Sequence, residues 1–501
     1  MFGDKILLLD FGGTQAQSVA RKLRGERIYC EVLPYHAPLE AIREAAPRGI
    51  ILAGGRAEEG DPRPDPGIFK LGIPVLALGY GARVLAEALG GKALGVLAEK
   101  RAADISFADC ALFEGLGESD RYFERVDAFE LPEGFATLAF SSGGLMPAFG
   151  NEQRDLYALQ FYPETNDPDG LRILFNFAVA ICGCASEWSV ERFLERELEE
   201  VRRRVGTREA LVAISGGVDS AVCAALMHRA IGDKLTCLYV NTGLMRKGET
   251  ELVAHVFREE LGMKLILVDA TERFMVRLMG VTDPREKRRA VADELMRVFA
   301  DEARKLRPVD FLARGTIYPD VIGGYSQTGA HGISAEAAAA KSIESEALVE
   351  PLRMLFKDEV RKVGEILGLP RELIGRQPFP GPGLAVRCVG EVNLQKLRMV
   401  RDADAIFCEE IVNAGLDKRI WQYFAVLTGA RTIGLRESGP CYENVIALRA
   451  VSSQDAVTAY AYRLPYDLLE RVVQRITTEV PGVNRVVYDM TGKPTAMIEW
   501  E

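Results

Sequence analysis

Short apolar runs alternate with longer amphipathic stretches from the N-terminus to about residue 183. The runs at 5–10, 49–53 and 74–78 are five or six residues long and are bounded by charged residues, Gly or Pro. Runs of this length are typical of buried strands, and the stretches between them are long enough for helices. The pattern therefore predicts an α/β domain built on a parallel sheet.

The same alternation resumes after a charge-rich segment at 187–207, which we expect to form a solvated helix. Predicted strands follow at 210–214, 234–240 and 264–269, with helical stretches between them. Because strands and helices alternate again, a second parallel sheet is expected.

The pattern changes near residue 390, where strands predicted at 444–449 and 485–489 are interspersed with helices in an α+β arrangement. The segment 377–383 repeats Pro and Gly, which excludes regular structure there. We therefore predict three domains, which span residues 1–186, 187–387 and 388–501.

The run Ser215-Gly216-Gly217-Val218-Asp219-Ser220 lies between the predicted strand at 210–214 and a predicted helix at 221–227. A glycine turn that leads into a helix N-terminus makes an anion cradle, because backbone N–H groups converge there and carry a positive partial charge. No Lys follows the glycines, so this is not the Gly-Lys-Ser/Thr loop of other nucleotide-binding proteins. It resembles the pyrophosphate loop of enzymes that split ATP between its α and β phosphates.

Composition adds constraints on the kind of protein. The 501 residues are 48% hydrophobic and 27% charged, with a formal net charge of −10, so nucleic-acid binding is not expected. No apolar run approaches the roughly 18 residues of a membrane helix, and the first residues do not read as a secretory segment. Nine scattered cysteines favour reduced thiols in a cytoplasmic protein.

Further motifs extend over essentially the whole chain and resemble those of the GMP synthetase family. They lie, in order, at 215–220, 268–274, 280–288, 315–321, 355–361, 378–387, 484–489, 493–494 and 498–501. The resemblance implies a class I glutaminase-like doubly wound domain, an ATP pyrophosphatase domain with a parallel sheet (adenine nucleotide α-hydrolase-like) and a C-terminal α+β domain. It also implies that the C-terminal domain forms a homodimer.

The resemblance also implies roles for individual residues, with ATP as substrate and Mg²⁺ as cofactor. Catalytic roles fall on Lys357, which would stabilise the departing pyrophosphate, and on Asp219. Asp219 and Asp358 would hold Mg²⁺ through oxygen ligands. The residues expected to bind ATP are Ser215, Gly216, Gly217, Val218, Asp219, Ser220, Val240, Gly315 and Thr316, and those expected to bind the acceptor are Arg387, Lys493 and Glu499. Lys357 and Asp358 could instead lie on a solvated face, and Lys493 and Glu499 could form a surface ion pair.

The chain departs from the family pattern in its N-terminal domain. The family's glutaminase has a Cys nucleophile in a strand-to-helix elbow, where this chain has Gly79. The family's His base is replaced by Tyr162, and only the carboxylate that orients the base, Glu164, remains. Thiol-based glutamine hydrolysis needs a thiolate and a neighbouring imidazole, so this domain is expected to be folded but inactive.

A second departure affects the acceptor site. The family's Lys-Ser-His-His-Asn-Val-Gly-Gly run, which helps to hold xanthosine monophosphate, is replaced at 330–342, and its Gly-Asp-x-Arg-Thr run is replaced near 436–440. Asn241 stands where an Asp usually ends the strand. Weakened binding of xanthosine monophosphate is therefore expected.

Three functions remain open. The first is a ligase that adenylylates a carbonyl of a purine nucleotide and displaces AMP with ammonia, free or from a separate nitrogen donor. The second keeps the adenylylation but uses another heterocyclic acceptor, or a sulfur or amino-acid nucleophile. The third is a non-catalytic nucleotide-binding protein, which the intact 215–220 run and the Lys357-Asp358 pair argue against.

Overall fold

The structure is a computed structural model that describes residues 4–55, 62–117, 119–141, 143–163, 168–306, 309–318, 320, 347–437, 439–453 and 458–501. It divides into two compact units, Met1–Phe193 and Leu194–Glu501. Within the described ranges, no helix combines the length and the apolar character needed to cross a membrane.

The first unit is built on a nine-stranded sheet in the order β2-β1-β3-β4-β9-β8-β7-β5-β6. Its strands are β1 (Ile6–Asp10), β2 (Cys30–Pro34), β3 (Gly49–Ala53), β4 (Val75–Leu78), β5 (Lys92–Phe107), β6 (Ser119–Glu130), β7 (Ala136–Phe140), β8 (Ala148–Asn151) and β9 (Leu156–Leu159). Its α-helices include α1 (Gln15–Gly25), α2 (Leu39–Ala45), α3 (Tyr80–Ala88) and α4 (Pro168–Phe175).

The predicted strands at 5–10, 49–53 and 74–78 correspond to β1, β3 and β4, which are parallel. The sheet is mixed, however, because β9, β8, β7, β5 and β6 follow one another in antiparallel pairs. The prediction of a parallel sheet therefore holds for β2, β1, β3, β4 and β9, and it was wrong for the antiparallel strands that follow β9 in the sheet. Antiparallel strands need no helix between them, so the alternation of strands and helices could not reveal them.

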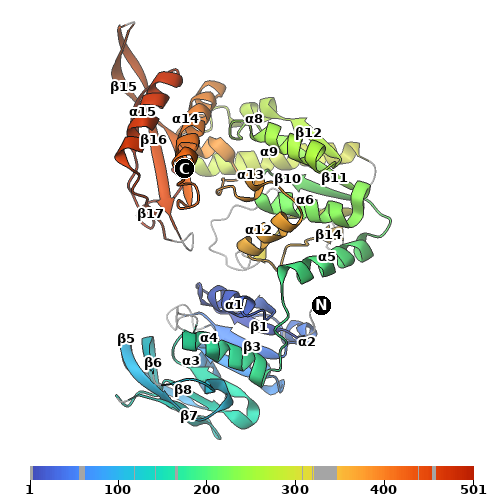
Figure 1. Cartoon of the computed structure of the whole chain (residues 1–501), viewed down its shortest axis with the longest axis vertical. Helices are drawn as coiled ribbons and strands as arrows, with labels where there is room; N and C mark the ends of the chain where they lie inside the picture. The colour runs from blue at the N-terminus through green and yellow to red at the C-terminus, as the bar shows by residue number, and fades with distance from the viewer. Residues whose placement is uncertain are drawn as a thin grey trace. The chain divides into compact units, whose positions relative to one another are not determined.

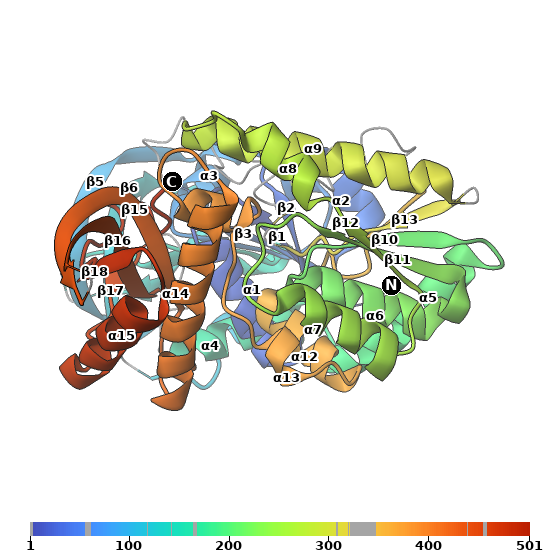
Figure 2. The same cartoon turned by 90° about the horizontal axis from the view of Figure 1, so that it is seen from above.

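The second unit contains a five-stranded sheet in the order β12-β11-β10-β13-β14, with every pair parallel. Its strands are β10 (Ala210–Ile214), β11 (Leu235–Asn241), β12 (Leu265–Asp269), β13 (Phe311–Ala313) and β14 (Leu348–Val349). The helices around it include α6 (Val218–Ile231), α7 (Glu249–His255), α8 (Thr271–Leu278), α9 (Pro284–Lys305), α12 (Lys357–Ile366) and α13 (Arg371–Ile374), while α5 (Val190–Val205) leads into this unit. Figure 2 shows α8 and α9 on one face of the strands and α6, α7 and α12 on the other.

A four-stranded sheet follows in the same unit. It consists of the antiparallel pair β15 (Gln422–Arg436) and β16 (Gly439–Ser452), with β17 (Tyr460–Ala461) and β18 (Val483–Tyr488) both paired to β16. The helices α14 (Leu394–Asn413) and α15 (Tyr466–Glu479) lie against these strands (Figure 1). The predicted α+β arrangement is therefore present after residue 390.

One hydrophobic core joins the two sheets of the second unit. It includes Val240 and Phe274 next to the parallel sheet, and Phe407 and Ile446 next to the antiparallel one. The predicted boundary at 387/388 falls inside this packed region, where Cys388 is fully buried and belongs to the same core. The five-stranded parallel sheet and the four-stranded C-terminal sheet therefore pack against one continuous hydrophobic core.

A buried ion pair between Lys287 and Glu501 attaches Glu501 to this core. The Lys287 side chain is fully buried on α9 and donates to the carbonyls of Ala385 and Cys388 at 3.3 and 2.7 Å. Its counter-charge is the Glu501 carboxylate, which also accepts the Gly390 N–H at 3.0 Å. The Glu501 side chain is only 7% exposed, so water cannot replace it as a partner for Lys287.

We predict that Glu501→Gln destabilises the second unit by about 3–5 kcal/mol, because it leaves a buried ammonium without a counter-charge. The midpoint of urea unfolding would measure the loss. Glu302→Gln is the matched control, since Glu302 pairs at 2.5 Å with an exposed Lys305 and should contribute under about 1 kcal/mol. An unchanged midpoint for Glu501→Gln would show that the Lys287 charge does not depend on this carboxylate.

Candidate functional site

The turn between β10 and α6 is held by two serine hydroxyls. Ser220 Oγ accepts the Ser215 N–H at 3.1 Å and donates to the Gly217 carbonyl at 3.1 Å. Ser215 Oγ accepts the Gly217 N–H at 3.3 Å and lies 3.0 Å from Ser220 Oγ. Gly216 has a φ of +80°, which a residue with a side chain rarely adopts. The turn presents the first N–H groups of α6, which lack helical acceptors, to the space above it.

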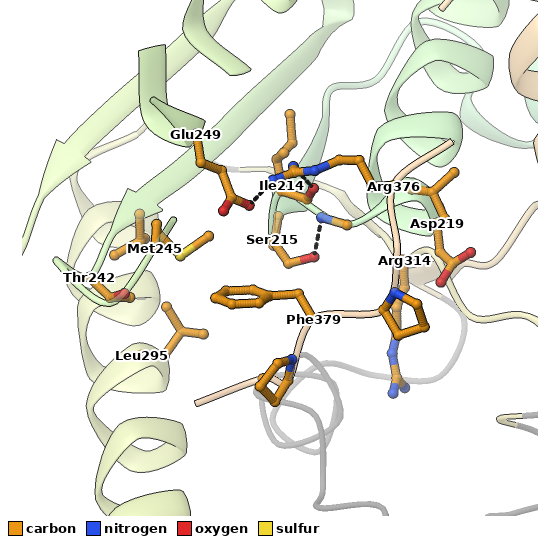
Figure 3. Close-up of a pocket in the computed structure, with 18 of the residues that line it drawn as sticks. Ile214, Ser215, Asp219, Thr242, Met245, Glu249, Leu295, Arg314, Arg376 and Phe379 are labelled. Carbon is orange, nitrogen blue, oxygen red and sulfur yellow. Dashed lines mark hydrogen bonds and ion pairs between the residues drawn. The ribbon is translucent and has the colours of Figure 1, made fainter. Parts of the chain in front are cut away.

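A cavity of about 380 Å³ opens over this turn. Figure 3 shows the Phe379 ring extending between Leu295 and Ser215. One part of the cavity is polar and contains the turn and several cationic side chains, and the rest is apolar. The apolar lining residues include Leu238, Val240, Leu295, Met296, Phe299 and Leu312. An anion cradle next to an apolar compartment suits a ligand with phosphates at one end and a heterocycle at the other.

Asp219 and Lys357, the two residues given catalytic roles by the family resemblance, both line this cavity and contact each other. Lys357 Nζ donates to the two carboxylate oxygens of Asp219 at 2.7 and 2.6 Å. Burial raises the pKa of Asp219, while the Lys357 and Arg361 charges lower it and the Asp320 charge raises it further. Because Lys357 is the first residue of α12 and Asp219 lies in the first turn of α6, the pair joins two helix N-termini beside the anion cradle.

Arg376 and Glu249 line the cavity and hold the turn in place, and neither residue was predicted from the sequence. Arg376 Nη1 donates to the Gly216 carbonyl at 2.7 Å, and Arg376 Nη2 lies 2.7 Å from Glu249 Oε1 (Figure 3). A Cβ on Gly216 would lie 2.8 Å from the same Glu249 oxygen. The only local signal was that Arg376 directly precedes the Pro- and Gly-rich loop, which gave no reason to place it at the turn.

Gly315 and Thr316 are absent from the described residues that line the cavity. A Cβ on Gly315 would lie 2.8 Å from the carbonyl carbon and oxygen of Asp219 and 2.9 Å from the Ser220 nitrogen. Gly315 therefore permits the segment after β13 to lie against the first turn of α6. The Thr316 hydroxyl donates to Glu350. Direct contact of these two residues with ATP stays a prediction. In the structure Gly315 lies against the first turn of α6, and Thr316 binds Glu350.

Of the two residues predicted for Mg²⁺, Asp219 is among the described residues that line the cavity and Asp358 is not. Asp219 lines the cavity and offers carboxylate oxygens, the ligands that Mg²⁺ prefers. Asp358 follows Lys357 on α12 but is exposed and does not appear among the described lining residues. Among the residues described, no group of three or more His, Cys, Asp or Glu side chains forms a metal cluster. The donors therefore fit a Mg²⁺ ion whose other ligands come from phosphates, with Asp219 as the protein ligand.

Arg387 and Glu499 form a buried pair outside the described cavity lining. Arg387 is fully buried, and its guanidinium binds the Glu499 carboxylate through two hydrogen bonds of 3.1 Å. It also lies over the Phe424 ring, 4.1 Å from the centroid. Glu499 accepts a further hydrogen bond from Gln422 at 2.9 Å. Arg387 also lies 5.1 Å from the centroid of the Phe379 ring, which lines the cavity. Direct contact of the fully buried Arg387 with the acceptor stays a prediction, as does that of the half-buried Lys493.

The glutaminase-like elbow has no room for a nucleophile. Gly79 has φ +54° and ψ −115°, between β4 and α3, and a Cβ built on it would lie 2.3 Å from Tyr162 Oη and 2.4 Å from Tyr162 Cζ. The Tyr162 ring therefore occupies the position where a Cys side chain would begin. Glu164 lies outside the described residues.

The other thiols of the first unit are poor substitutes. Cys30, Cys110, Cys182 and Cys184 are all buried free cysteines. Burial raises the pKa of Cys110 and Cys182, and it raises the pKa of Cys184 to about 12, so their thiolates are scarce at neutral pH. His36 is the only histidine among residues 1–193 and packs edge-on against the neighbouring Tyr35 ring.

Of the two runs that depart in the acceptor region, only one can be placed. Residues 330–342 lie outside the described residues, whereas Arg436 ends β15 and pairs with Gly439, the first residue of β16. Arg436 is engaged within its own domain, where it donates to Glu443 at 2.8 Å and to the carbonyls of Thr477 and Val483 at 2.7 and 2.6 Å. Asn241 Oδ1 accepts the Gly243 N–H at 3.0 Å and so shapes the turn after β11.

Comparisons with known proteins match the three regions in order. Family models described as Glutamine amidotransferase class-I, NAD synthase and GMP synthase C terminal domain match residues 7–181, 189–295 and 409–500. These matches confirm the predicted fold class: a class I glutamine amidotransferase domain, an ATP pyrophosphatase domain and a C-terminal α+β domain.

Full-length relatives are also similar to this chain. A protein of Symbiobacterium thermophilum named GMP synthase (glutamine-hydrolyzing) is 47% identical over 509 residues, which cover 99% of each chain. Proteins of the same name are 44% identical in Clostridium tetani, with 99% of each chain covered, and 47% identical in Thermomicrobium roseum, with 99% of this chain and 97% of the relative covered.

We predict that Gly315→Ala lowers stability by about 1–3 kcal/mol and weakens ATP binding, because the new methyl group meets backbone atoms at the start of α6. Thermal unfolding and calorimetric titration with ATP would measure the two effects. The control is Gly25→Ala, at the end of α1, where a Cβ meets nothing within 4 Å. If Gly315→Ala and Gly25→Ala behaved alike, the close approach at Gly315 would not matter for the site.

Proposed function

We propose, since this chain belongs to the GMP synthase family, that it is an ATP-dependent ligase which replaces a carbonyl oxygen of a purine nucleotide with an amine and releases AMP and pyrophosphate. The observation that carries this proposal is the cavity over the Ser215–Ser220 turn, with the Asp219–Lys357 pair at its polar end. We take xanthosine monophosphate as the acceptor and GMP as the product, following the name of the relatives.

The reaction proceeds in two displacements. The acceptor carbonyl oxygen attacks the α-phosphorus of ATP, an O–P bond forms, and the bond from that phosphorus to the bridging oxygen breaks with release of pyrophosphate. Ammonia then attacks the activated carbon, the C–O bond breaks, AMP departs, and the nitrogen loses one proton to solvent. The other proton released is that of the acceptor's ring N–H, which is lost when the carbonyl oxygen forms the O–P bond.

The chain's own residues contribute mainly position and charge. The N–H groups at the start of α6 hold the pyrophosphate oxygens, and the apolar residues around Leu238 and Phe299 accept the adenine ring. Lys357 stabilises the negative charge that develops on the leaving pyrophosphate. Mg²⁺, held by Asp219 and the phosphates, would supply further charge neutralisation.

We test this by incubating the full chain with ATP, Mg²⁺, ammonia and xanthosine monophosphate. AMP, pyrophosphate and GMP are the expected products, and removal of Mg²⁺ with EDTA should stop the reaction. Lys357→Ala and Asp219→Ala should lower the rate by two or more orders of magnitude, since each removes a charge at the reacting phosphates. Lys305→Ala, at an exposed end of α9, is the control. Release of ADP and phosphate would refute the mechanism, and normal rates in both variants would refute the site.

A second candidate is the same adenylylation with another heterocyclic acceptor. It is favoured by the altered runs at 330–342 and 436–440 and by the internal contacts of Arg436. Release of AMP and pyrophosphate with a different oxo-heterocycle, but not with xanthosine monophosphate, would select it. Mass spectrometry of the product distinguishes the two candidates.

We also propose that the N-terminal domain does not hydrolyse glutamine, although the relatives are named glutamine-hydrolyzing. Two observations support this: Gly79 provides no nucleophile, and Tyr162 fills the space in which one would stand. Nitrogen then comes from free ammonia or from a separate donor. We further propose a homodimer through residues 388–501, supported by Ile433 and Leu435 of β15, which are 76% and 81% exposed.

We predict no glutamate release from glutamine by the wild-type chain, with or without ATP and acceptor. Gly79→Cys alone should remain inactive and lose stability, because its side chain collides with the Tyr162 ring. Gly79→Cys combined with Tyr162→His removes the collision and supplies a base, so it is the variant in which any glutaminase activity would first appear. Tyr162→His alone is the control. Turnover by the wild type would overturn the proposal.

A further inference from the structure

Four of the described residues that line the cavity have cationic side chains, and only some of these have a carboxylate partner. Lys357 is paired with Asp219, Arg376 with Glu249, and Arg314 lies 3.8 Å from Glu350. Arg361, the fourth, forms no hydrogen bond or ion pair with any residue in the described part of the chain. Its Nε atom is inaccessible to solvent and has no acceptor.

The placement of Arg361 directs it toward the anion cradle. It follows Lys357 by four residues on α12, so the two side chains lie on the same face of that helix. Lys357 contacts Asp219 directly, and the Arg361 charge is also close enough to act on that carboxylate. Both cations therefore lie beside the first turn of α6.

A guanidinium with a buried, unsatisfied N–H is costly unless an acceptor reaches it. Among the described residues that line the cavity there are four cations and two carboxylates, Asp219 and Glu249, each already paired with another cation. An anionic ligand would supply both the missing acceptor and the missing charge. The planar fork of Arg matches the oxygens of a phosphate better than the point charge of Lys does.

We propose that Arg361 binds the pyrophosphate half of ATP and is a catalytic residue for its departure. This inference rests on the function proposed above. When the bond between the α-phosphorus and the bridging oxygen breaks, its electron pair moves onto the pyrophosphate, which gains negative charge. A cation that contacts this group binds it more tightly after bond cleavage than before, and therefore promotes the cleavage.

The test is calorimetric titration of the full chain with inorganic pyrophosphate and, separately, with AMP, both in the presence of Mg²⁺. Arg361→Gln should weaken pyrophosphate binding roughly tenfold or more, because a hydrogen bond to a charged group is lost, and should leave AMP binding within about twofold. Arg361→Lys keeps the positive charge but lacks the planar guanidinium, so its affinity for pyrophosphate should lie between those of Arg361→Gln and the wild type. The matched control is Lys362→Gln, because Lys362 is the next residue on α12, is 52% exposed and pairs at the surface with Glu365.

Unchanged pyrophosphate binding in Arg361→Gln would overturn the inference, and so would an equal loss of pyrophosphate and AMP binding, which indicates a structural role. Should Arg361→Gln fail to fold, Arg361→Lys provides the same comparison. The inference and the proposed function fail separately: a wild-type chain that binds pyrophosphate and AMP but yields ADP refutes the function alone. A wild-type chain that binds neither refutes both.

Discussion

The hydrogen bond from Arg376 to the Gly216 carbonyl fixes the geometry on which the site depends. The peptide between Gly216 and Gly217 is held at both of its polar groups, because Arg376 binds the Gly216 carbonyl and Ser215 Oγ accepts the Gly217 N–H on the opposite side of the trans peptide. Glu249 in turn holds Arg376, and it occupies space that a side chain at position 216 would need. The glycine is therefore required both by its positive φ and by this packing, and the anion cradle is prepared before a ligand arrives.

The C-terminal part of the chain takes part in building this cavity. Arg401 of α14 donates to the carbonyls of Gly243 and Met245 at 2.6 and 2.9 Å, and so anchors the turn that carries cavity residues after β11. The Arg387–Glu499 and Lys287–Glu501 pairs attach the last residues to the same core. Because these charges are buried, breaking either pair leaves a strongly unfavourable unpaired group, which links the integrity of the site to the C-terminus.

Local sequence signals predicted the parts of this protein that depend on local structure. The strand at 210–214 and the glycine turn were predicted from short apolar runs and from motifs, and Asp219 and Lys357 were named as candidates, whereas their contact was not predicted. Features set by tertiary contact were not found: the antiparallel half of the first sheet, the Arg376–Glu249 support and the free guanidinium of Arg361. Gly315 was assigned to ATP contact because it belongs to a motif, which stays a prediction, and its neighbours show in addition that it allows the segment after β13 to lie against the first turn of α6. Sequence spacing on α12 could have drawn attention to Arg361, since it lies one turn beyond Lys357.

In the N-terminal domain, the residue types at positions 79 and 162 depend on each other because their side chains would compete for the same space. Tyr162 places its hydroxyl 2.3 Å from the point where any side chain at position 79 would begin, so Tyr162 requires glycine at that position. Gly79 in turn retains the backbone angles of a tight strand-to-helix elbow, φ +54° and ψ −115°, which glycine adopts with little strain. The strand β4 and the helix α3 therefore keep their connection with glycine at this position. A side chain introduced at position 79 would meet the Tyr162 ring first, so the packing at this elbow, and not only the residue type at position 79, decides whether a nucleophile could stand there.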